Sequence, residues 1–579
     1  MAARPAAKRL APERVRVGLL GLVLLLAWAG LGARLFEVQV VRASEFAELG
    51  LGQRMTRKTL APDRGTIFDR DGEPLAMTVE ARTIYAVPAL LTDAVYATQM
   101  VSAYTGKPVD PMRNAIEKGG NFAYMARQID PDIAQLVMDL GLPGVFMINE
   151  PKRVYPAASI ASHVVGFVDI DGKGLEGLEF RYDLHLTGTP GEVEFERDVS
   201  GTPIPQGQLR EIPAVPGDDV VTTIDLPLQF AAADACSRAM EASQAIGCWI
   251  VVLHAETGEI LAMAGAPRFD PVTRQSADGS AFTNFAVRGM YEPGSTQKLV
   301  TMATALDTGA FRPADVIKGV ADQLEINAGA CDESDDDIFG CYRDVNKHET
   351  INMTVQEIFT KSSNVGTIKM SQRLPAGSLV EYMERFGLGA PTGVDYSGEA
   401  AGAVRIDPGC TTCLASAAIG YSVAVTSLQM AAAFAAIAND GVWTQPYLTS
   451  ATVDVNGRLS EFVPKTRRVV KAETAWTIRQ LLSDVVLEGT GTAAQIPGYR
   501  VGGKTGTAEK LVNGVYTDQN MASFVGMAPI DDPKVVVAVL IDEPSYETRY
   551  GGISAAPAFA EVMEAALHRL GVAPSGTEQ

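Results

Sequence analysis

The sequence predicts an α+β protein in which one N-terminal membrane helix is followed by a region of short helices and strands and then by a three-layer domain with an antiparallel sheet. Three observations carry this prediction. A charge-free apolar run lies near the start of the chain, segments with helix and strand periodicity alternate from residue 217 onwards, and 47% of the 579 residues are hydrophobic. Such a chain can fill at least two hydrophobic cores.

The membrane helix is predicted from VGLLGLVLLLAWAGLGA, the uncharged run from Val17 to Ala33. At 1.5 Å per residue this run reaches roughly 26 Å, and a snorkelling Arg34 would help it cross a ~30 Å hydrocarbon core. The preceding residues are mostly basic, which predicts that the N-terminus is cytoplasmic and that the rest of the chain lies outside. A cleaved signal peptide stays open as the alternative, because the run is short and ends in small residues.

The composition divides the whole chain into five segments. We predict a cytoplasmic tail (1–16), the membrane helix (17–36), a region of short elements broken by Gly and Pro (37–216), a larger regular domain (217–572) and a C-terminal tail (573–579). The chain has a formal net charge of -20. This charge excludes nucleic acid as the main partner, because phosphate binding needs clustered Lys and Arg.

The larger domain shows its elements in order. Helical spacing of apolar residues predicts a helix over 226–242, and two apolar runs around a Glu-Thr-Gly turn predict a hairpin over 247–267. The run KVVVAVLID (534–542) is suited to a strand buried on both faces. An amphipathic helix closes the domain over 556–570, and a helical continuation of the membrane span is expected over 35–56. Helices that enclose an antiparallel sheet define three layers.

If the chain is exported, its cysteines can form disulfides, because disulfides persist outside the cytoplasm. Cys331 and Cys341 enclose an acidic stretch, and their closeness favours a loop-closing bridge. Cys410 and Cys413 form a CxxC that no second CxxC completes, so a disulfide or two free thiols are favoured over a metal site. The acidic run Asp332–Asp337 lacks the spacing of a calcium loop and is interpreted as a solvated loop.

The chemistry of the chain is first indicated by YEPGSTQKLVT, in which Ser295 and Lys298 are three residues apart after a Pro-Gly turn. On a helix these positions share one face, so the two side chains can meet. A serine at a helix N-terminus also lies where free backbone N–H groups favour negative charge. Taken alone, this S-x-x-K pattern is a weak signal that occurs by chance in many proteins, and a helix-capping serine explains it better.

Two further motifs change this interpretation. KSSNVGT supplies S-x-N as Ser362 and Asn364, with Ser363 between them, and GGKTGTA supplies K-T-G at residues 504–506. S-x-x-K, S-D-N and K-T-G together are the set of penicillin-binding proteins and class A β-lactamases. All three occur here in the expected order. Ser363 stands where those β-lactamases place Asp.

The residue types fit acyl transfer. A serine hydroxyl such as that of Ser295 needs a base, and Lys298 can act as one if Lys504 and burial lower its pKa. Ser362 could relay the proton to the leaving amine, and Asn364 could orient Lys298 or hold the peptide backbone of the substrate.

The K-T-G strand would bind the substrate. Lys504, Thr505, Gly506 and Thr507 form a positive, hydroxyl-bearing edge suited to a carboxylate. The backbone N–H groups of Ser295 and Thr507 would form the oxyanion hole.

A competing serine occurs in GYSVA, where Ser422 faintly resembles the nucleophile elbow of α/β-hydrolases. That mechanism needs a suitably placed histidine, and the chain has only five. The scarcity of histidine favours Ser–Lys chemistry.

With these motifs the chain resembles the class B penicillin-binding proteins, most closely the division-specific peptidoglycan D,D-transpeptidases of the penicillin-binding protein 3 type. The resemblance rests on RGTIFDRDGEPLA (64–76), RVYP (153–156), HVVGFVD, GLEGLE (174–179), YEPGST, SSNVGT, RFGLGAPTG, IANDG and GKTGTA. Two departures concern the rim of the site: Ser422 stands where the family usually has glycine, and the CxxC lies near a segment that commonly contains tryptophan.

The resemblance implies a bitopic enzyme with an elongated α+β pedestal of the dimerisation type (37–216) and a transpeptidase domain (217–572). It implies that D-Ala-D-Ala stem peptides acylate Ser295, that β-lactams acylate the same serine, and that a membrane glycosyltransferase of the shape, elongation and division family is a partner. Because no glycosyltransferase domain precedes the pedestal, class A is excluded. We expect no cofactor and no metal ion.

Two other functions stay open. One is a penicillin-recognising hydrolase or sensor, such as a D,D-carboxypeptidase or β-lactamase, although S-S-N offers no evident extra carboxylate for deacylation. The other is a non-catalytic scaffold of the division machinery. The acceptor amine, diaminopimelate or lysine, is not determined by the sequence.

Overall fold

The computed structural model describes residues 12–574, except 197–203, 205–208, 275–278, 328–329, 332–339, 405, 408–409, 411 and 513. Contacts divide the chain into two compact units. One contains the residues up to Pro62 together with Thr189–Val215, and the other contains Asp63–Gly188 and the residues from Pro216 onwards. Most of the region predicted as the pedestal is therefore part of the larger unit.

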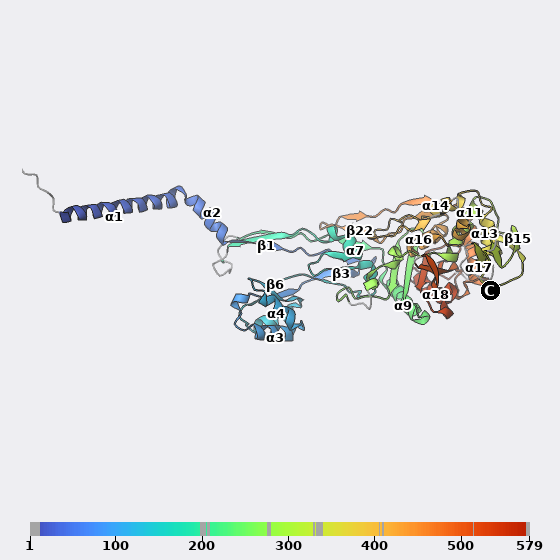
Figure 1. Cartoon of the computed structure of the whole chain (residues 1–579), viewed down its shortest axis with the longest axis horizontal. Coiled ribbons are helices and arrows are strands. Elements are labelled where there is room, and N and C mark those ends of the chain that lie inside the picture. The colour runs from blue at the N-terminus through green and yellow to red at the C-terminus, as the bar shows by residue number, and fades with distance from the viewer. Residues whose placement is uncertain are drawn as a thin grey trace, which may run out of the picture. The chain divides into compact units, whose positions relative to one another are not determined.

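The smaller unit begins with the long apolar helix α1 (Pro12–Phe36), labelled in Figure 1. A π-helical turn, η1 (Glu37–Val41), and a second helix, α2 (Ala43–Arg54), follow it. Within the described residues, the stretch from Glu13 to Val41 is the one helix long and apolar enough to cross a membrane, with a mean hydropathy of 2.0. The predicted helical continuation to Thr56 is two residues too long, because Met55 and Thr56 already pair in a sheet.

That sheet is antiparallel and has the order β1-β10-β11. Its strands are β1 (Met55–Leu60), β10 (Gly191–Glu196) and β11 (Leu209–Ile212).

In the larger unit, a mixed sheet with the order β23-β22-β12-β2-β3-β7 joins strands from distant parts of the sequence. Only β12 and β2 are parallel. The strands are β2 (Ile67–Phe68), β3 (Pro74–Val79), β7 (Lys152–Val154), β12 (Asp219–Thr222), β22 (Thr449–Val453) and β23 (Leu459–Glu461). The sheet therefore combines strands from both sides of the predicted border at residue 216.

Next to this sheet lies a small lobe with its own apolar core, which includes Ile84, Val101 and Val137. Its sheet has the order β5-β4-β6. Its elements are β4 (Arg82–Ala86), α3 (Ala94–Thr105), α4 (Val109–Glu117), β5 (Ala123–Ile129), α5 (Pro131–Asp139) and β6 (Val145–Asn149).

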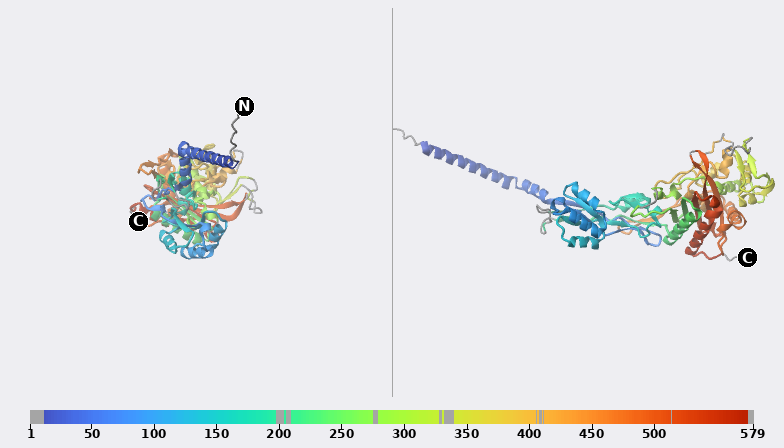
Figure 2. Two further views of the ribbon diagram at one scale, coloured as in Figure 1. Left: turned by 90° about the vertical axis from the view of Figure 1, so that its left-hand side faces the viewer. Right: turned by 60° about the horizontal axis from the view of Figure 1, so that its bottom comes forward.

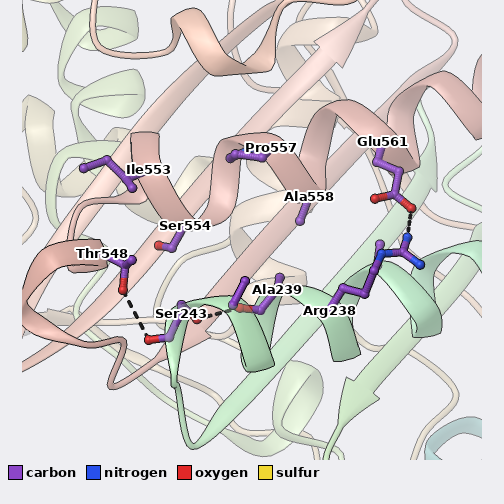
Figure 3. Close-up of a pocket in the computed structure, with 11 residues that line it drawn as sticks. Arg238, Ala239, Ser243, Thr548, Ile553, Ser554, Pro557, Ala558 and Glu561 are labelled. Carbon is purple, nitrogen blue, oxygen red and sulfur yellow. Dashed lines mark hydrogen bonds and ion pairs between the residues drawn. The ribbon is translucent and has the colours of Figure 1, made fainter.

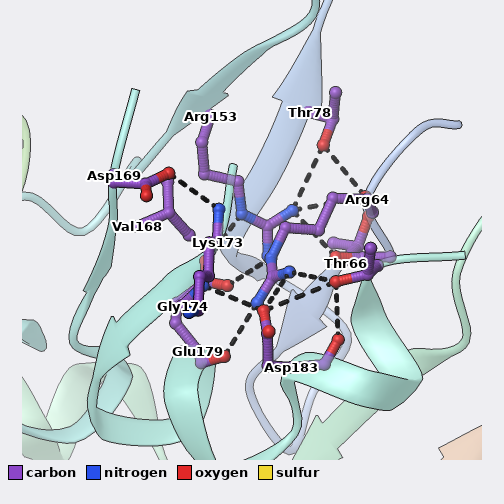
Figure 4. A network of polar contacts seen from close by, with 12 residues as sticks. Arg64, Thr66, Thr78, Arg153, Val168, Asp169, Lys173, Gly174, Glu179 and Asp183 are labelled. Carbon is purple, nitrogen blue, oxygen red and sulfur yellow. Dashed lines mark hydrogen bonds and ion pairs between the residues drawn. The ribbon is translucent and has the colours of Figure 1, made fainter. Parts of the chain in front are cut away.

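A buried ion-pair network connects three of the sequence motifs that carried the family resemblance (Figure 4). Glu179 is fully buried, and its two carboxylate oxygens accept hydrogen bonds of 2.6 Å each from Nε of Arg64 and Nε of Arg153. Arg64 also binds Asp183 at 2.8 Å. These residues come from RGTIFDRDG, RVYP, GLEGLE and the helix that follows it. The network therefore joins segments that are far apart in the sequence.

The C-terminal part of this unit is built on a five-stranded antiparallel sheet with the order β14-β13-β27-β26-β25. The strands are β13 (Gly247–His254), β14 (Ile260–Ala266), β25 (Gly502–Val512), β26 (Val515–Ala528) and β27 (Val535–Asp542). The predicted hairpin and the predicted buried strand are both confirmed, since every residue of β27 is buried. Among the described residues β25 pairs only with β26, so one of its edges has no strand partner there.

Helices cover both faces of this sheet, which confirms the three predicted layers (Figures 1 and 2). One face packs against α9 (Leu226–Ser243) and α18 (Gly551–Arg569). The other packs against α11 (Lys298–Asp307), α16 (Ser427–Ala438) and α17 (Ala472–Glu488). Alternate residues of the central strands supply the two cores, as the period of a β-strand requires.

Helix α18 begins five residues before the predicted start at Ala556. Its first two residues are glycines, which are poor helix formers, so the sequence pattern did not reveal this turn. A Cβ atom on Gly551 would lie 2.1 Å from the carbonyl oxygen of Ser523 and 2.5 Å from that of Gly506. The helix needs glycine there because it passes directly over the sheet.

A shallow pocket of about 250 Å³ lies between α9 and α18 (Figure 3). Four of its eleven lining residues are alanines, and an ion pair between Arg238 and Glu561 lies at one end. None of the predicted site residues lines it.

The remaining elements surround the two sheets. The helices are α6 (Ser162–Val165), α7 (Gly177–Arg181), α8 (Asp183–Leu186), α10 (Phe285–Arg288), α12 (Val355–Thr360), α13 (Asn364–Ser371), α14 (Ser378–Arg385) and α15 (Cys413–Ala418). The strands are β8 (Phe167–Val168), β9 (Gly174–Glu176), β15 (Val316–Val320), β16 (Gln323–Glu325), β17 (Cys341–Arg343), β18 (Ile351–Thr354), β19 (Ala403–Val404), β20 (Val423–Ala424), β21 (Val442–Thr444) and β24 (Thr466–Arg468).

All six cysteines form disulfides. The predicted bridge between Cys331 and Cys341 is confirmed, and the CxxC is a disulfide rather than two thiols. The third bridge, from Cys236 on α9 to Cys248 on β13, was not predicted. The acidic run between Cys331 and Cys341 lies outside the described residues, so its predicted loop remains a prediction.

Candidate active site

Ser295 lies in a tight turn rather than at the cap of a helix. The turn is the 3-10 segment η4 (Gly294–Gln297), and α11 begins at Lys298 with Gln297 as its N-cap. Neither segment has a side-chain cap, and Ser295 Oγ has no hydrogen-bond partner among the described residues. The alternative role of Ser295 as a capping residue is therefore wrong, and its half-buried hydroxyl is unengaged.

Lys298 is almost completely buried, with 1% of its surface exposed. Its Nζ donates to the carbonyl oxygen of Ser362 (2.7 Å), to Asn364 Oδ1 (2.6 Å) and to Ser362 Oγ (3.3 Å). Burial, and next the positive charge of Lys504, lower the pKa of Lys298 well below its usual value, while Asp344 opposes this effect. An amine of this kind can be neutral and serve as a base.

The hydroxyl of Ser362 lies between two amines. Nζ of Lys504 donates to Ser362 Oγ at 2.9 Å, and Lys298 approaches the same oxygen from its own helix. Burial lowers the pKa of Lys504 to about 7. Ser362 has a φ of 59°, in the left-handed region that non-glycine residues seldom adopt. Such backbone strain is typical of functional sites.

Asn364 begins α13, and both ends of its amide are engaged. Oδ1 accepts from Lys298, and Nδ2 donates to the carbonyl oxygen of Arg343 at 2.8 Å. This arrangement fixes the orientation of the amide and directs its oxygen to the lysine. S-x-x-K and S-x-N are thus brought together, as the motif chemistry requires.

Sequence reasoning missed Asp344, whose carboxylate binds the S-x-N segment. Oδ2 accepts from Ser363 Oγ at 2.7 Å, and Oδ1 accepts from the backbone N–H groups of Asn364 (2.5 Å) and Val365 (3.0 Å). Its side chain is 8% exposed and also contacts His348. The one available signal was Ser363 itself, which stands where related motifs carry Asp. The carboxylate is instead supplied from a loop nineteen residues before Ser363.

The K-T-G motif lies on β25, next to the serine turn. A Cβ atom on Gly506 would lie 2.9 Å from the carbonyl oxygen of Pro293, so only glycine permits this approach. A Cβ atom on Gly294 would lie 2.7 Å from the carbonyl oxygen of Thr507. Because the N–H and C=O of one strand residue point to the same side, the N–H of Thr507 also lies on the free edge of β25.

The hydroxyl groups of the strand have different surroundings. Thr505 Oγ1 is 2.7 Å from Thr490 Oγ1 and is largely buried. Thr507 is partly exposed, and its Oγ1 accepts from the N–H of Gly551 at 3.2 Å. The first turn of α18, which the sequence did not reveal, therefore supports the strand.

Ser422 is not a second nucleophile of the α/β-hydrolase kind. The sheet is antiparallel, and among the described residues, which include all five histidines, no histidine forms a hydrogen bond with Ser422. Its φ of 62° explains why glycine is usual at this position, and its backbone N–H donates to Glu292 Oε1 at 2.7 Å. Among the described residues, no cluster of three or more His, Cys, Asp or Glu side chains is arranged to bind a metal ion.

Comparisons with known proteins agree with this geometry. The penicillin binding protein transpeptidase domain matches residues 248–564, and the penicillin-binding protein dimerisation domain matches residues 59–222. The chain is 35% identical to a probable peptidoglycan D,D-transpeptidase PenA from Neisseria meningitidis, over 97% of this chain and 94% of that protein. It is 30% identical to the peptidoglycan D,D-transpeptidase FtsI from Escherichia coli, over 96% and 92% of the two chains.

A solved structure shows the same fold. Penicillin binding protein 3 from Mycobacterium tuberculosis, in complex with aztreonam, matches with a TM-score of 0.69 and 31% identity, over 90% of this chain and 98% of that chain. The chain therefore belongs to the penicillin-binding protein transpeptidases. Its dimerisation domain, followed by a transpeptidase domain, identifies it as a class B member, which confirms the family predicted from the motifs.

Proposed function

We propose that this chain is a peptidoglycan D,D-transpeptidase that cross-links stem peptides through an acyl-serine intermediate, with Ser295 as nucleophile. The observation that carries the proposal is that two buried lysines, Lys298 and Lys504, converge on Ser362 Oγ, and that Lys298 follows Ser295 by three residues. Both amines have lowered pKa values, so a neutral base and a proton relay are available together. The relatives named peptidoglycan D,D-transpeptidase support the same reaction.

In the first half-reaction, neutral Lys298 takes the proton of Ser295 as Oγ attacks the carbonyl carbon of the penultimate D-alanine. The backbone N–H groups of Ser295 and Thr507 stabilise the oxyanion. Collapse of the intermediate breaks the C–N bond, and the proton passes through Ser362 to the leaving D-alanine. In the second half-reaction an amine of a neighbouring stem attacks the ester, Lys298 accepts its proton, and the Ser295 oxygen is released and reprotonated.

The substrate carboxylate binds at the K-T-G edge. Lys504 supplies positive charge, and Thr505 and Thr507 supply hydroxyl donors on the same strand. Gly506 lets the strand approach the serine turn. Asn364 holds the amine of Lys298 in place through its side-chain oxygen and can also contact the peptide of the donor.

β-Lactams acylate the same serine because they mimic the donor. The aztreonam complex of the mycobacterial relative supports this assignment. Gel labelling with a fluorescent penicillin tests it with three proteins: wild type, Ser295→Ala and Ser422→Ala as the matched serine control. A slowly cleared band that is lost only in Ser295→Ala is expected. A band that persists in Ser295→Ala would refute Ser295 as the nucleophile.

The rate at which the band clears distinguishes the transpeptidase from a hydrolase. A β-lactamase or carboxypeptidase would need a water-activating base at the ester. The nearby carboxylate of Asp344 has both oxygens engaged with α13 and with Ser363, which argues against that role. No band in folded wild type would favour the scaffold instead.

The same proposal places the enzyme in septal cell-wall synthesis, anchored by α1 with its N-terminus in the cytoplasm and its catalytic domain outside. The proposed partner is a membrane glycosyltransferase of the shape, elongation and division family. The name of the Escherichia coli relative and the apolar stretch from Glu13 to Val41 support the proposal. Mass spectrometry of the mature protein should recover residues 17–36, whereas a cleaved signal peptide would remove them.

A further inference from the structure

The carboxyl group of Glu292 lies where three segments around the active serine meet. Glu292 is three residues before Ser295. Its Oε1 accepts from the backbone N–H of Ser422 at 2.7 Å and from the hydroxyl of Tyr516 at 3.3 Å. The three segments are the serine turn, the loop from Gly420 to Val425, and the β25–β26 hairpin.

The serine turn and the Gly420–Val425 loop run side by side. Tyr291 and Val425 exchange two backbone hydrogen bonds of 2.9 Å each, and the N–H of Gly294 donates to the carbonyl oxygen of Gly420 at 3.1 Å. Between these contacts Ser422 leaves the regular pairing with its φ of 62°. The side chain of Glu292 provides the acceptor that its N–H would otherwise lack.

The contact with Tyr516 reaches the K-T-G strand. Tyr516 is near the start of β26 and lies opposite Leu511 of β25; the pairing of the two strands is irregular between Glu509 and Leu511 and regular from Glu509 back to Gly502. The ring of Tyr516 packs edge-on against Tyr421, with 5.6 Å between the ring centres. One carboxyl oxygen therefore connects the turn that carries Ser295 with the hairpin that carries the substrate-binding strand.

This carboxyl group is costly to bury. Its second oxygen, Oε2, is buried without a hydrogen-bond partner among the described residues. Burial raises the pKa of Glu292, although Ser422 and Tyr516 oppose the shift. The titratable groups that face this cluster are Tyr421, Tyr516 and Glu509 of β25. A buried carboxyl group with one unsatisfied oxygen destabilises the fold. Its presence beside the active serine therefore calls for a functional explanation.

We propose that Glu292 is a positioning residue that sets the distance between the serine turn and the K-T-G strand by binding Ser422 and Tyr516 at once. The inference rests on the proposed function, because it concerns the acylation of Ser295. Without this acceptor, the turn and the hairpin would move independently, and the oxyanion hole shared between Ser295 and Thr507 would lose its geometry. A misplacement of about 1 Å can slow such a reaction about a hundredfold.

The test compares acylation by a fluorescent penicillin in wild type, Glu292→Gln, Glu292→Ala and Tyr516→Phe. Gln keeps an oxygen acceptor without the charge, Ala removes the acceptor, and Phe removes one donor only. The matched control is Asp518→Asn, which alters an exposed carboxylate on β26 of the same hairpin. Acylation is measured at several penicillin concentrations, so that the rate constant at saturation is separated from the dissociation constant of the initial complex.

We expect Glu292→Ala to lower the saturating rate constant at least about tenfold with a small change in the dissociation constant, and Glu292→Gln to restore it to within about threefold. Tyr516→Phe should lie between Ala and wild type, and it keeps the proposal testable if Glu292→Ala does not fold. Wild-type rates in both Glu292→Ala and Tyr516→Phe would overturn the inference. A Gln variant as slow as Ala would also overturn it, since charge rather than the acceptor would then matter. A wild type that is not acylated at all would instead refute the proposed function.

Discussion

Replacement of Asp344 should separate the positioning of the S-x-N segment from the chemistry of Lys298. The carboxylate makes three short hydrogen bonds to consecutive residues, with Ser363 Oγ at 2.7 Å and the N–H groups of Asn364 and Val365 at 2.5 and 3.0 Å. Two of these satisfy free N–H groups at the start of α13, so Asp344 acts as a helix cap supplied from another loop.

The magnitude follows from these contacts. A hydrogen bond to a charged group contributes about 1.5–3 kcal/mol, and loss of an N-cap costs about 0.5–2 kcal/mol. Because the three contacts share one carboxylate, their losses do not add, and Asp344→Ala should lower the free energy of unfolding by about 3 kcal/mol. Asp344→Asn keeps one oxygen for the two N–H groups and should cost about 1 kcal/mol.

The effect on acylation should exceed the effect on folding. Once Asp344 is removed, the backbone at the start of α13 is no longer held in place, so Asn364 can shift relative to Lys298. We expect penicillin acylation by folded Asp344→Ala to be about 10–100 times slower than in wild type, and Asp344→Asn to stay within about tenfold.

Urea unfolding and the rate of fluorescent-penicillin labelling measure the two effects on the same samples. Asp322→Asn serves as the control, because Asp322 contacts Asp344 through its backbone carbonyl group and not through its carboxylate. Wild-type acylation in Asp344→Ala that is shown to be folded would refute the positioning role.

Three further predictions concern stability. The folded-state pKa of Lys504 is about 7 and the unfolded value is near 10.5, so the unfolded chain binds more protons between these values and the free energy of unfolding should rise with pH in this window. Lys504→Met should reduce that slope by up to about 1.4 kcal/mol per pH unit in urea titrations, and an unchanged slope would contradict the lowered pKa. Glu179→Ala removes the carboxylate that pairs with two buried guanidinium groups and should lower the free energy of unfolding by about 3–5 kcal/mol. Asp531→Ala breaks an exposed ion pair and should lower it by less than about 1 kcal/mol. Equal losses in the two variants would show that burial of the ion pair does not matter here. Replacing both Cys236 and Cys248 with Ala should lower the free energy of unfolding by about 2–4 kcal/mol, and identical denaturation midpoints with and without the bridge would refute this.

The sequence was sufficient wherever a short stretch carried its own chemistry or periodicity. The apolar runs of β13, β14 and β27 have the length of buried strands, and turn residues flank them, so strands were favoured over helices. They are found within a residue or two of the predicted bounds. The three motifs were recognisable because Ser295, Lys298 and their partners are residue types that acyl transfer requires.

The elements that sequence reasoning missed depend on long-range packing. Gly551 and Gly552 hide the first turn of α18 because glycine carries no helical signal, and only the approach of the helix to the sheet explains them. The Cys236–Cys248 bridge depends on how α9 returns onto β13, which spacing alone does not determine.

The sequence by itself determined the class of chemistry, the order of the motifs and the antiparallel core, because these depend on residue type and on local periodicity. The tertiary structure alone decided that Asp344 and Glu292 support the site. Glu292 lies in YEPGST but outside S-x-x-K, and Asp344 lies in none of the three motifs. Each acts through hydrogen bonds to segments that are distant in the chain. Such contacts form only when the loops are packed, because a carboxylate is directed by the donors that surround it and not by its neighbours in sequence.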